Sequence, residues 1–288
     1  MVTPFVQEKE AVLPEPLRAA LRARVDGELG LPLLSEIAGR VMVVCQDPRG
    51  DLQELADLVT HDQSLAVHVL RVANSAAYAP RGPILSLQQA ISRLGLSTVR
   101  DVAIAAALKE CIFSVPGHHQ RLRDLWLHSA ATACYAKEAA QLLRRNLESA
   151  FLCGLLHDVG MPIVMQVVCD LARNQVTAPV PAPVMEAAML EFHCEFGAKV
   201  AQRWRLGPWI SSSILYHHDP TRAKSLRDEV LVTALADALA DWAMDARQGE
   251  KDLLVDQHLA QELSLSKDTL SALLRQRQHV LKVALAFL

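Results

Sequence analysis

Residues 150–160 read AFLCGLLHDVG, an almost wholly apolar run that ends in an adjacent histidine and aspartate, His157 and Asp158. We expect helices over about 148–157 and 161–174, on either side of this point. Successive side chains of a helix diverge by only about 100°, so the pair suits a single metal ion. Any further ligands then have to come from separate helices that meet in a bundle.

Other histidines and aspartates of the second half also lie on stretches with helical patterns. Neutral imidazoles and carboxylates hold divalent iron, manganese or zinc in open sites, where the metal lowers the pKa of bound water. The candidate metal ligands are, in chain order, Asp124, His128, His157, Asp158, His193, His217, His218 and Asp237. Asp124 is included because it precedes His128 by four residues and shares its helix face. The set predicts one or two divalent ions.

Two alternatives remain open for this set. Asp241, one helical turn after Asp237, is an alternative to it. The competing hypothesis for the whole set is that these polar side chains satisfy one another in a buried pocket without metal.

The composition of the 288-residue chain predicts an all-α fold. Hydrophobic residues make up 51% and aromatic residues 5%, and the apolar residues are mainly alanine, leucine and valine. This mixture favours helices packed on helices over a β-sandwich, and no alternating strand pattern of useful length is present.

Charge and cysteine usage exclude several classes of function. A net charge of −3 disfavours nucleic acid as a partner, although residues 90–105 superficially resemble a helix-turn-helix. Six cysteines without a C-x-x-C pair favour reduced thiols over disulfides or a zinc ribbon. We expect no signal peptide and no membrane span, and therefore a cytoplasmic protein.

Helix boundaries follow from capping residues. Asp62, Ser86, Ser97 and Ser266 are the expected N-caps, with Gln89 completing a capping-box spacing after Ser86 and Gly95 ending that helix. Turns are expected at 47–51 and 116–119, and a proline-rich linker at 177–183. The expected helices cover about 15–28, 31–44, 52–59, 62–72, 86–94, 97–108, 120–143, 148–157, 161–174, 184–204, 208–217, 226–246, 252–263 and 266–288. Asn74 and Ser75 begin a loop, as a helix C-cap or as part of a partner-binding surface.

The order His, His-Asp, His, His-His, Asp resembles the HD superfamily of metal-dependent phosphohydrolases, especially its cyclic-dinucleotide phosphodiesterase branch. More narrowly, the chain is similar to the HDOD family, the HD-related output domain of bacterial signalling. The segments that carry this resemblance are LPLLSEIAGRV (31–41), LVTHDQSLAVHVLRVANSAAY (58–78), ILSLQQAISRLGLSTVRDVAIA (84–105), LWLHSAATA (125–133), AFLCGLLHDVG (150–160) and the run from His193 to His218.

The resemblance, over about 31–220, implies an N-terminal helical subdomain packed on an HD-like helical bundle. We expect a tail and leading helix at 1–30, the N-terminal helical half at 31–115, the bundle at 116–246 and a C-terminal helical extension at 247–288. It also implies a signal-transduction output module, usually non-catalytic, that acts through a signalling protein partner or by sensing a ligand or metal. A nucleotide is a candidate ligand.

The chain departs from the phosphodiesterase branch at two points. That branch continues its His-Asp motif with Gly-Lys, whereas Gly160 is followed here by Met161; it also has a Gly-Tyr-Pro signature where Asp219-Pro220-Thr221 stands here. Both departures favour a regulatory module. The alternative is a metal-dependent phosphohydrolase acting on a nucleotide or cyclic dinucleotide, in which Asp158 would be the catalytic residue.

Overall fold

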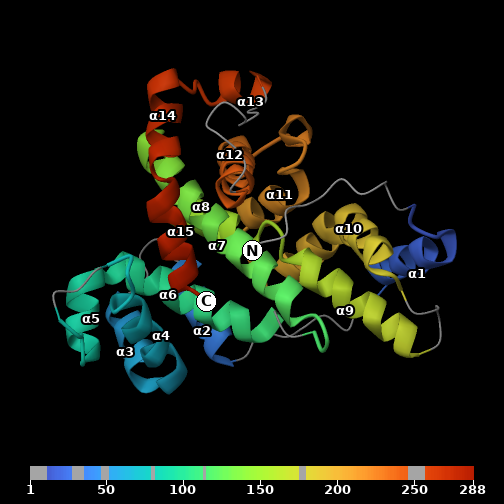
Figure 1. Ribbon diagram of the computed structural model, residues 1–288. Coiled ribbons are helices and arrows are strands. Elements are labelled where there is room, and N and C mark those ends of the chain that lie inside the picture. Colours follow the sequence, from blue (N-terminus) through green and yellow to red (C-terminus); the bar gives the residue numbers. More distant parts are fainter. Residues whose placement is uncertain are drawn as a thin grey trace.

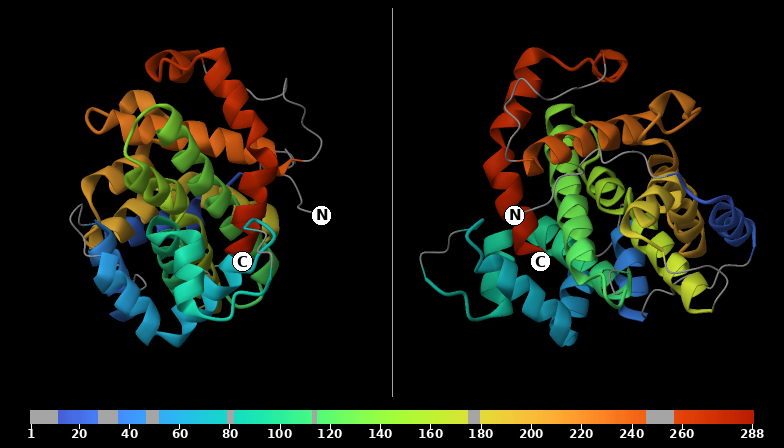
Figure 2. Two further views of the ribbon diagram at one scale, coloured as in Figure 1. Left: turned by 90° about the vertical axis from the view of Figure 1, so that its left-hand side faces the viewer. Right: turned by 45° about the vertical axis from the view of Figure 1, so that its right-hand side comes forward.

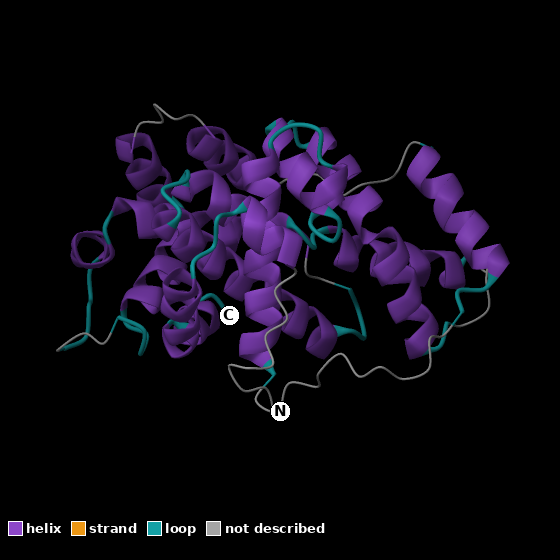
Figure 3. Ribbon diagram, turned by 90° about the horizontal axis from the view of Figure 1, so that it is seen from above, coloured by secondary structure: helices purple, strands orange, loops and turns teal. Residues whose placement is uncertain are grey.

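The computed structural model describes residues 12–27, 36–46, 52–78, 82–112, 115–174, 180–245 and 257–288. Within these ranges every regular element is a helix and no strand occurs (Figure 3). The all-α prediction is therefore confirmed. The expected turn at 47–51, the start of the tail and the first part of the proline-rich linker lie outside the described residues.

The helices fall into an N-terminal group and a larger bundle (Figure 1). The N-terminal group contains α2 (Glu36–Gln46), α3 (Leu52–His61), α4 (Gln63–Ala73), α5 (Leu87–Leu94) and α6 (Leu96–Ile112), whereas the first helix, α1 (Glu15–Asp26), lies on the bundle. The bundle contains α7 (His119–Leu142), α8 (Leu147–Leu156), α9 (Gly160–Arg173), α10 (Ala182–Arg203), α11 (Pro208–Tyr216), the short 3-10 helix η1 (Pro220–Arg222) and α12 (Arg227–Met244). The last helices are α13 (Gln257–Glu262), α14 (Lys267–Arg275) and α15 (Arg277–Ala286).

Local capping explains where several helices begin. The Asp62 carboxylate accepts a hydrogen bond from the backbone N–H of Leu65 at 2.7 Å, and the Ser86 hydroxyl accepts one from that of Gln89 at 3.2 Å. The Ser266 hydroxyl accepts one from the N–H of Thr269 at 3.0 Å. Such bonds satisfy N–H groups that the first turn of a helix leaves without partners. These three predicted N-caps are confirmed.

Three expected boundaries are wrong. Ser97 is not an N-cap, because α6 begins at Leu96; its hydroxyl instead accepts a hydrogen bond from Lys137 at 3.2 Å. The helix expected from Ser266 to the end is divided at Gln276 into α14 and α15. His157 and Asp158 lie in the turn between α8 and α9, not on a helix, so their relative orientation is not set by the helical repeat.

Helix α6 connects the N-terminal group to the rest of the molecule. It packs against α2, α3, α4 and α5, and every residue from Val99 to Leu108 is buried. Burial on all sides is typical of a helix enclosed by its neighbours. Asp101 on α6 pairs with Lys137 on α7, which joins the two groups of helices by a nearly buried ion pair.

Helix α7 is the central element of the bundle and, at 24 residues, is about 36 Å long. It packs against α8, α12, α14 and α15. Small residues on its buried faces, such as Ala130, Ala133 and Ala136, allow these helices to approach closely. His128 and Lys137 therefore lie on one rigid element, about nine residues apart in sequence.

The ends of the described chain both pack on the bundle. Helix α1 packs against α9 and α10, where the Arg18 guanidinium donates to the Glu191 carboxylate at 2.8 Å. Helix α15 lies along α7 and also contacts α4, so the C-terminal helices run along the bundle to the N-terminal group (Figure 2). The Trp126 indole N–H donates to the carbonyl of Phe287 at 3.1 Å. The four domain boundaries stated above remain predictions.

The stretch Ser149–Arg173 is apolar and long enough to cross a bilayer by composition alone, but 89% of its most apolar part is buried inside the molecule. This is the burial expected of α8 and α9 as core helices.

Candidate metal centre

The first group of candidate ligands comes from α7, α12 and the turn after α8. His128 on α7 places its Nε2 atom 2.9 Å from Oδ1 of Asp237 on α12. His157 Nε2 lies 3.3 Å from that same oxygen and 3.3 Å from His128 Nε2. Packing of α12 against both α7 and α8 brings these three side chains together, although they are separated by up to 109 residues.

The second group comes from α10 and the end of α11. His193 on α10 places Nε2 3.1 Å from Nε2 of His218. His217 and His218 follow the last residue of α11, and their rings lie 4.0 Å apart. His193, Cys194, His217 and His218 each offer one ligand atom, all within 4.8 Å of one another. The two consecutive histidines thus face the middle of α10.

Asp158 lies between the two groups, with one carboxylate oxygen directed to each. Its Oδ2 atom is 3.4 Å from His157 Nε2 and 4.0 Å from His128 Nε2. Its Oδ1 atom is 3.4 Å from His193 Nε2 and 3.6 Å from His217 Nε2. This is the arrangement of a carboxylate able to bridge two metal ions, or to complete the ligand set of one.

Three histidines are held in one tautomer by the backbone. The Nδ1 atom of His157 lies 2.8 Å from the carbonyl of Gly154, that of His193 3.0 Å from the carbonyl of Met189, and that of His217 3.0 Å from the carbonyl of Ile214. Because a carbonyl only accepts, each Nδ1 carries the proton and donates it. In its neutral form each ring then directs an unprotonated Nε2 into the centre, as metal-bound histidines do.

Two buried polar atoms at the centre have no hydrogen-bond partner within the described chain: Asp158 Oδ1 and His217 Nε2. Both belong to nearly buried residues, with exposed fractions of 8% for Asp158 and 3% for His217. A buried polar atom without a partner is costly, and a divalent cation would satisfy these two acceptor atoms together. The side chains present therefore fit a metal.

Protons partly take the place of such a cation when none is bound. Burial opposes the charged form of His157, but Asp158 and Asp237 outweigh it and raise its pKa well above the usual histidine value. Burial likewise opposes ionisation of the two carboxyls, yet His157 holds the pKa of Asp158 and of Asp237 well below the usual range. A protonated His157 between the two carboxylates offsets part of their negative charge.

In the second group the pKa values of two histidines shift in the opposite direction, downwards. Burial lowers the pKa of His193, and burial together with His217 and His193 lowers the pKa of His218 to about 4. Burial also raises the pKa of the Cys194 thiol to about 12. His193 and His218 are thus held as neutral imidazoles whose nitrogens are available as ligands.

The structure places Asp124 and Asp241 outside the two groups of candidate ligands described above. Asp124 is not in any of the three ligand groups of the described chain, and its carboxylate accepts a hydrogen bond from Gln120 at 3.0 Å. The Asp241 side chain is 65% exposed and lies 3.4 Å from His128 Nδ1. Asp237 is therefore the inner carboxylate, and Asp241 orients His128 from the rim.

Cys194 is the member of the cluster that the sequence reasoning missed. Its Sγ atom lies 3.3 Å from His193 Nε2. A signal was present, because it directly follows a candidate ligand, but a cysteine on an apolar helix is usually an ordinary core residue. Only the position of the His217–His218 turn over α10 shows which way it faces.

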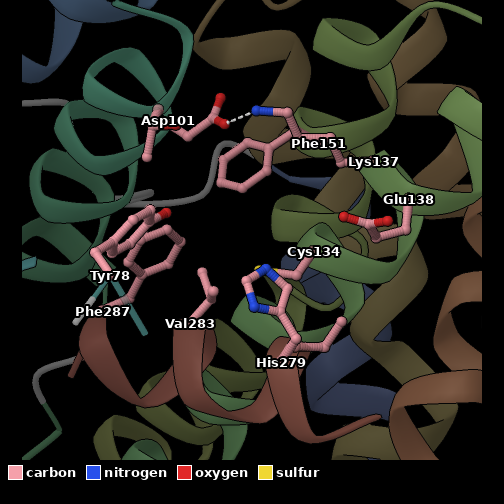
Figure 4. A pocket seen from close by; sticks show the side chains of 11 residues that line it. Tyr78, Asp101, Cys134, Lys137, Glu138, Phe151, His279, Val283 and Phe287 are labelled. Atoms are coloured by element: carbon pink, nitrogen blue, oxygen red, sulfur yellow. Dashed lines mark hydrogen bonds and ion pairs between the residues drawn. The ribbon is translucent and has the colours of Figure 1, made fainter. Parts of the chain in front are cut away.

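A separate cavity of about 250 Å³ lies where α6, α7, α8 and α15 meet, shown in Figure 4. Asp101 and Lys137 form an ion pair on one side of it, and Glu138, His279 and Val283 line other parts. Because α7 contributes both Lys137 and His128, the cavity and the candidate metal centre share one helix.

Comparisons with known proteins agree with this architecture. The family model of the HDOD domain matches residues 31–220. A structure from Marinobacter aquaeolei VT8, named a "putative signal transduction protein", has a TM-score of 0.71 at 22% identity and is matched over 97% of this chain and 68% of that chain. This likeness shows the fold.

Two structures are similar at slightly higher identity. A "putative phosphohydrolase" from Shewanella amazonensis SB2B has a TM-score of 0.68 at 26% identity, over 94% of this chain and 98% of its own. An HDOD domain protein of unknown function from Geobacter sulfurreducens has a TM-score of 0.59 at 26% identity, over 90% of this chain and 87% of its own.

An uncharacterized protein of Treponema pallidum (strain Nichols) is 23% identical over 210 residues, which are 70% of this chain. The chain spans 40% of the length of that relative. The match of the family model to residues 31–220 covers about two thirds of the chain, and it includes the N-terminal helices as well as the histidines of the bundle. The chain belongs to the HDOD domain family.

Proposed function

We propose that this protein is a cytoplasmic signal-transduction module whose HD-like centre binds divalent transition metal and which senses or regulates rather than hydrolyses. The observation that carries the metal part is shared by His157, His193 and His217. Each ring donates Nδ1–H to a backbone carbonyl and directs its Nε2 atom towards Asp158. Membership in the family of HD-related output domains supports the signalling part.

The donor set indicates which ions fit. His128, His157 and Asp237 would hold one ion, His193, His217 and His218 another, with Asp158 shared between them. Imidazole and carboxylate together suit iron, manganese or zinc better than calcium or magnesium. A bound ion of this kind supplies a Lewis acid and lowers the pKa of bound water.

Two features favour regulation over catalysis. Met161, which stands where the related phosphodiesterases have lysine, is 3% exposed and offers no positive charge to a phosphate. Losing one contact that stabilises a transition state costs a few kcal/mol, about a hundredfold or more in rate. Asp219, Pro220 and Thr221 replace the glycine-containing signature after His218. In this proposal the centre controls the bundle, and the N-terminal helices bind a signalling protein.

The second candidate function is a metal-dependent phosphohydrolase acting on a nucleotide or cyclic dinucleotide, with Asp158 as the catalytic residue. The retention of every inner ligand favours it, as does the 26% identity to a protein named as a "putative phosphohydrolase". In both proposals the partner or substrate is not a nucleic acid, and no membrane is involved.

Metal analysis tests the metal centre that both proposals require. Protein purified without a histidine tag is loaded with iron, manganese or zinc, and its metal content is measured. We expect one to two equivalents in the wild type, well under half of this in His157→Ala and Asp158→Ala, and the wild-type value in Asp124→Ala. Asp124 is a matched control because it lies on the same helix as His128 but outside the cluster. Wild-type content in Asp158→Ala would contradict the proposed centre.

An activity assay on the same samples tests the second candidate. Metal-loaded protein is incubated with cyclic di-GMP, other cyclic dinucleotides and guanosine tetraphosphate. We expect no turnover above the metal-free control. Turnover that is lost in Asp158→Ala but kept in Asp124→Ala would show instead that the protein is a working phosphohydrolase.

A further inference from the structure

The second ligand group contains a sulfur atom as well as nitrogen atoms. Cys194 Sγ lies 3.3 Å from His193 Nε2, and it forms one four-membered group with His193, His217 and His218. Cys194 is half-buried, on the side of α10 that faces the His217–His218 turn. The first ligand group, by contrast, consists of two histidines and an aspartate.

The spacing of these atoms matches that of ligands around a single ion. Metal–nitrogen and metal–sulfur bonds of about 2.0–2.3 Å separate neighbouring ligand atoms of a tetrahedral zinc site by about 3.3–3.6 Å. The observed separations are 3.3 Å between Cys194 Sγ and His193 Nε2 and 3.1 Å between His193 Nε2 and His218 Nε2. Only small side-chain adjustments would therefore place one ion in contact with all three.

An independent observation points to a cation at the same place. The Nε2 atom of His217 has no hydrogen-bond partner among the described residues, and its side chain is 0% exposed. Its Nδ1 atom donates to the carbonyl of Ile214 at 3.0 Å, so Nε2 presents a lone pair. Asp158 Oδ1, which lies 3.6 Å from this nitrogen, is itself an acceptor without a hydrogen-bond partner among the described residues.

We propose that the Cys194 thiolate is a ligand of the metal held by His193, His217 and His218, and that it makes this group select zinc or cobalt over manganese and magnesium. The inference rests on the proposed metal centre and assigns its selectivity. On binding, the Cys194 S–H bond is broken, a sulfur–metal bond forms, and the proton is released to solvent. Thiolate favours softer ions, whereas sites of oxygen and nitrogen alone accept manganese readily.

The competing explanation is a hydrogen bond from the Cys194 S–H group to His193 Nε2. A thiol that only donates this bond would stay protonated in the metal-loaded protein and would give no charge-transfer band to a bound ion. The two explanations therefore differ in a spectrum that is independent of any enzymatic activity.

Cobalt(II) spectroscopy on the full chain is the test. The variants are Cys194→Ser and, as matched control, Cys169→Ser, since Cys169 is a half-buried thiol next to His118 and in none of the ligand groups. We expect a thiolate-to-cobalt band in the near ultraviolet for the wild type and Cys169→Ser, and its loss in Cys194→Ser with visible cobalt bands retained. The preference for zinc over manganese should fall about tenfold or more in Cys194→Ser.

The outcomes distinguish the two proposals. If the wild type binds no cobalt, the metal centre itself is overturned. If it binds cobalt without a band that depends on Cys194, only this inference is overturned. Alkylation of the wild type guards against a variant that does not fold: zinc should slow modification of Cys194, measured by mass spectrometry, without slowing that of Cys169. Equal rates at Cys194 with and without bound zinc would contradict the inference.

Discussion

A β-carbon on Gly160 would lie 1.9 Å from the backbone carbonyl oxygen of His193. The contact is between backbone atoms of α9 and α10, so no side-chain movement can relieve it. Absence of a side chain at Gly160 therefore lets the helix that carries His193 approach the turn that carries His157 and Asp158.

Replacing Gly160 by alanine should force α9 and α10 apart. We expect the free energy of unfolding to fall by about 2–4 kcal/mol, and the bound metal to fall with it because His193 moves away from Asp158. Denaturant unfolding and metal analysis measure the two effects. Gly39→Ala is the control: a β-carbon there meets no atom within 4 Å, and alanine in a helix should add up to about 1 kcal/mol. Equal stability of both variants would contradict the packing argument.

Zinc should stabilise the protein more as the pH rises. In the metal-free protein the pKa of His157 is raised, so the stability from its proton is complete below the ordinary histidine pKa and is lost as the pH rises through the raised value. The lowered pKa values of Asp158 and Asp237 act only at much lower pH. As the pH rises, fewer protons compete with zinc for the ligand atoms.

We therefore expect the increase in Tm produced by zinc to grow between about pH 6 and about pH 8.5. Thermal unfolding with and without zinc checks this, and His157→Gln should flatten the dependence. A zinc-induced increase that shrinks as the pH rises would mean that metal and proton do not compete at this histidine.

The ion pair between Asp101 and Lys137 should stabilise the contact of α6 with α7. The Asp101 side chain is 5% exposed and that of Lys137 is 25% exposed, so Lys137→Met leaves a buried carboxylate without its ammonium partner. We expect a loss of about 2–3 kcal/mol. Arg145→Met is the control, because the pair with Asp228 has side chains that are 43% and 52% exposed and should contribute less than about 1 kcal/mol. Similar losses in both variants would argue against a buried pair.

Asn74 should hold the loop between α4 and α5. Its side-chain amide donates to the carbonyls of Leu70 and Ile84 at 2.9 Å each, and its oxygen accepts from the N–H of Ile84 at 2.8 Å. Asn74→Ala should cost about 1–3 kcal/mol. Asn74→Asp retains the acceptor for the Ile84 N–H but puts an acceptor-only oxygen in place of the donor, so it separates the role of the acceptor from that of the donor. Hydrogen exchange at the Ile84 amide should accelerate in the alanine variant and change little in the aspartate variant; unchanged exchange in both would show that the loop does not depend on this side chain.

Features that depend on a few neighbouring residues were predictable from the sequence. The caps at Asp62, Ser86 and Ser266 join atoms three residues apart, so their chemistry is visible in the local pattern. The order of histidines and aspartates and the alanine-rich helices likewise indicated an all-α, HD-like protein. Ser97 was misjudged because Gly95, with a φ of +76°, allows α6 to begin at Leu96.

The composition of the candidate metal centre was decided by tertiary packing. His128 and Asp124 share a helix face, yet only His128 meets Asp237, because α12 crosses α7 at that level. Cys194 belongs to the cluster because the turn after α11 lies over α10, and the position of α10 depends on the missing side chain at Gly160. Sequence alone determined which ligand chemistry the chain carries. Only the structure decided which atoms converge, since contacts between residues up to 109 positions apart depend on how closely whole helices pack.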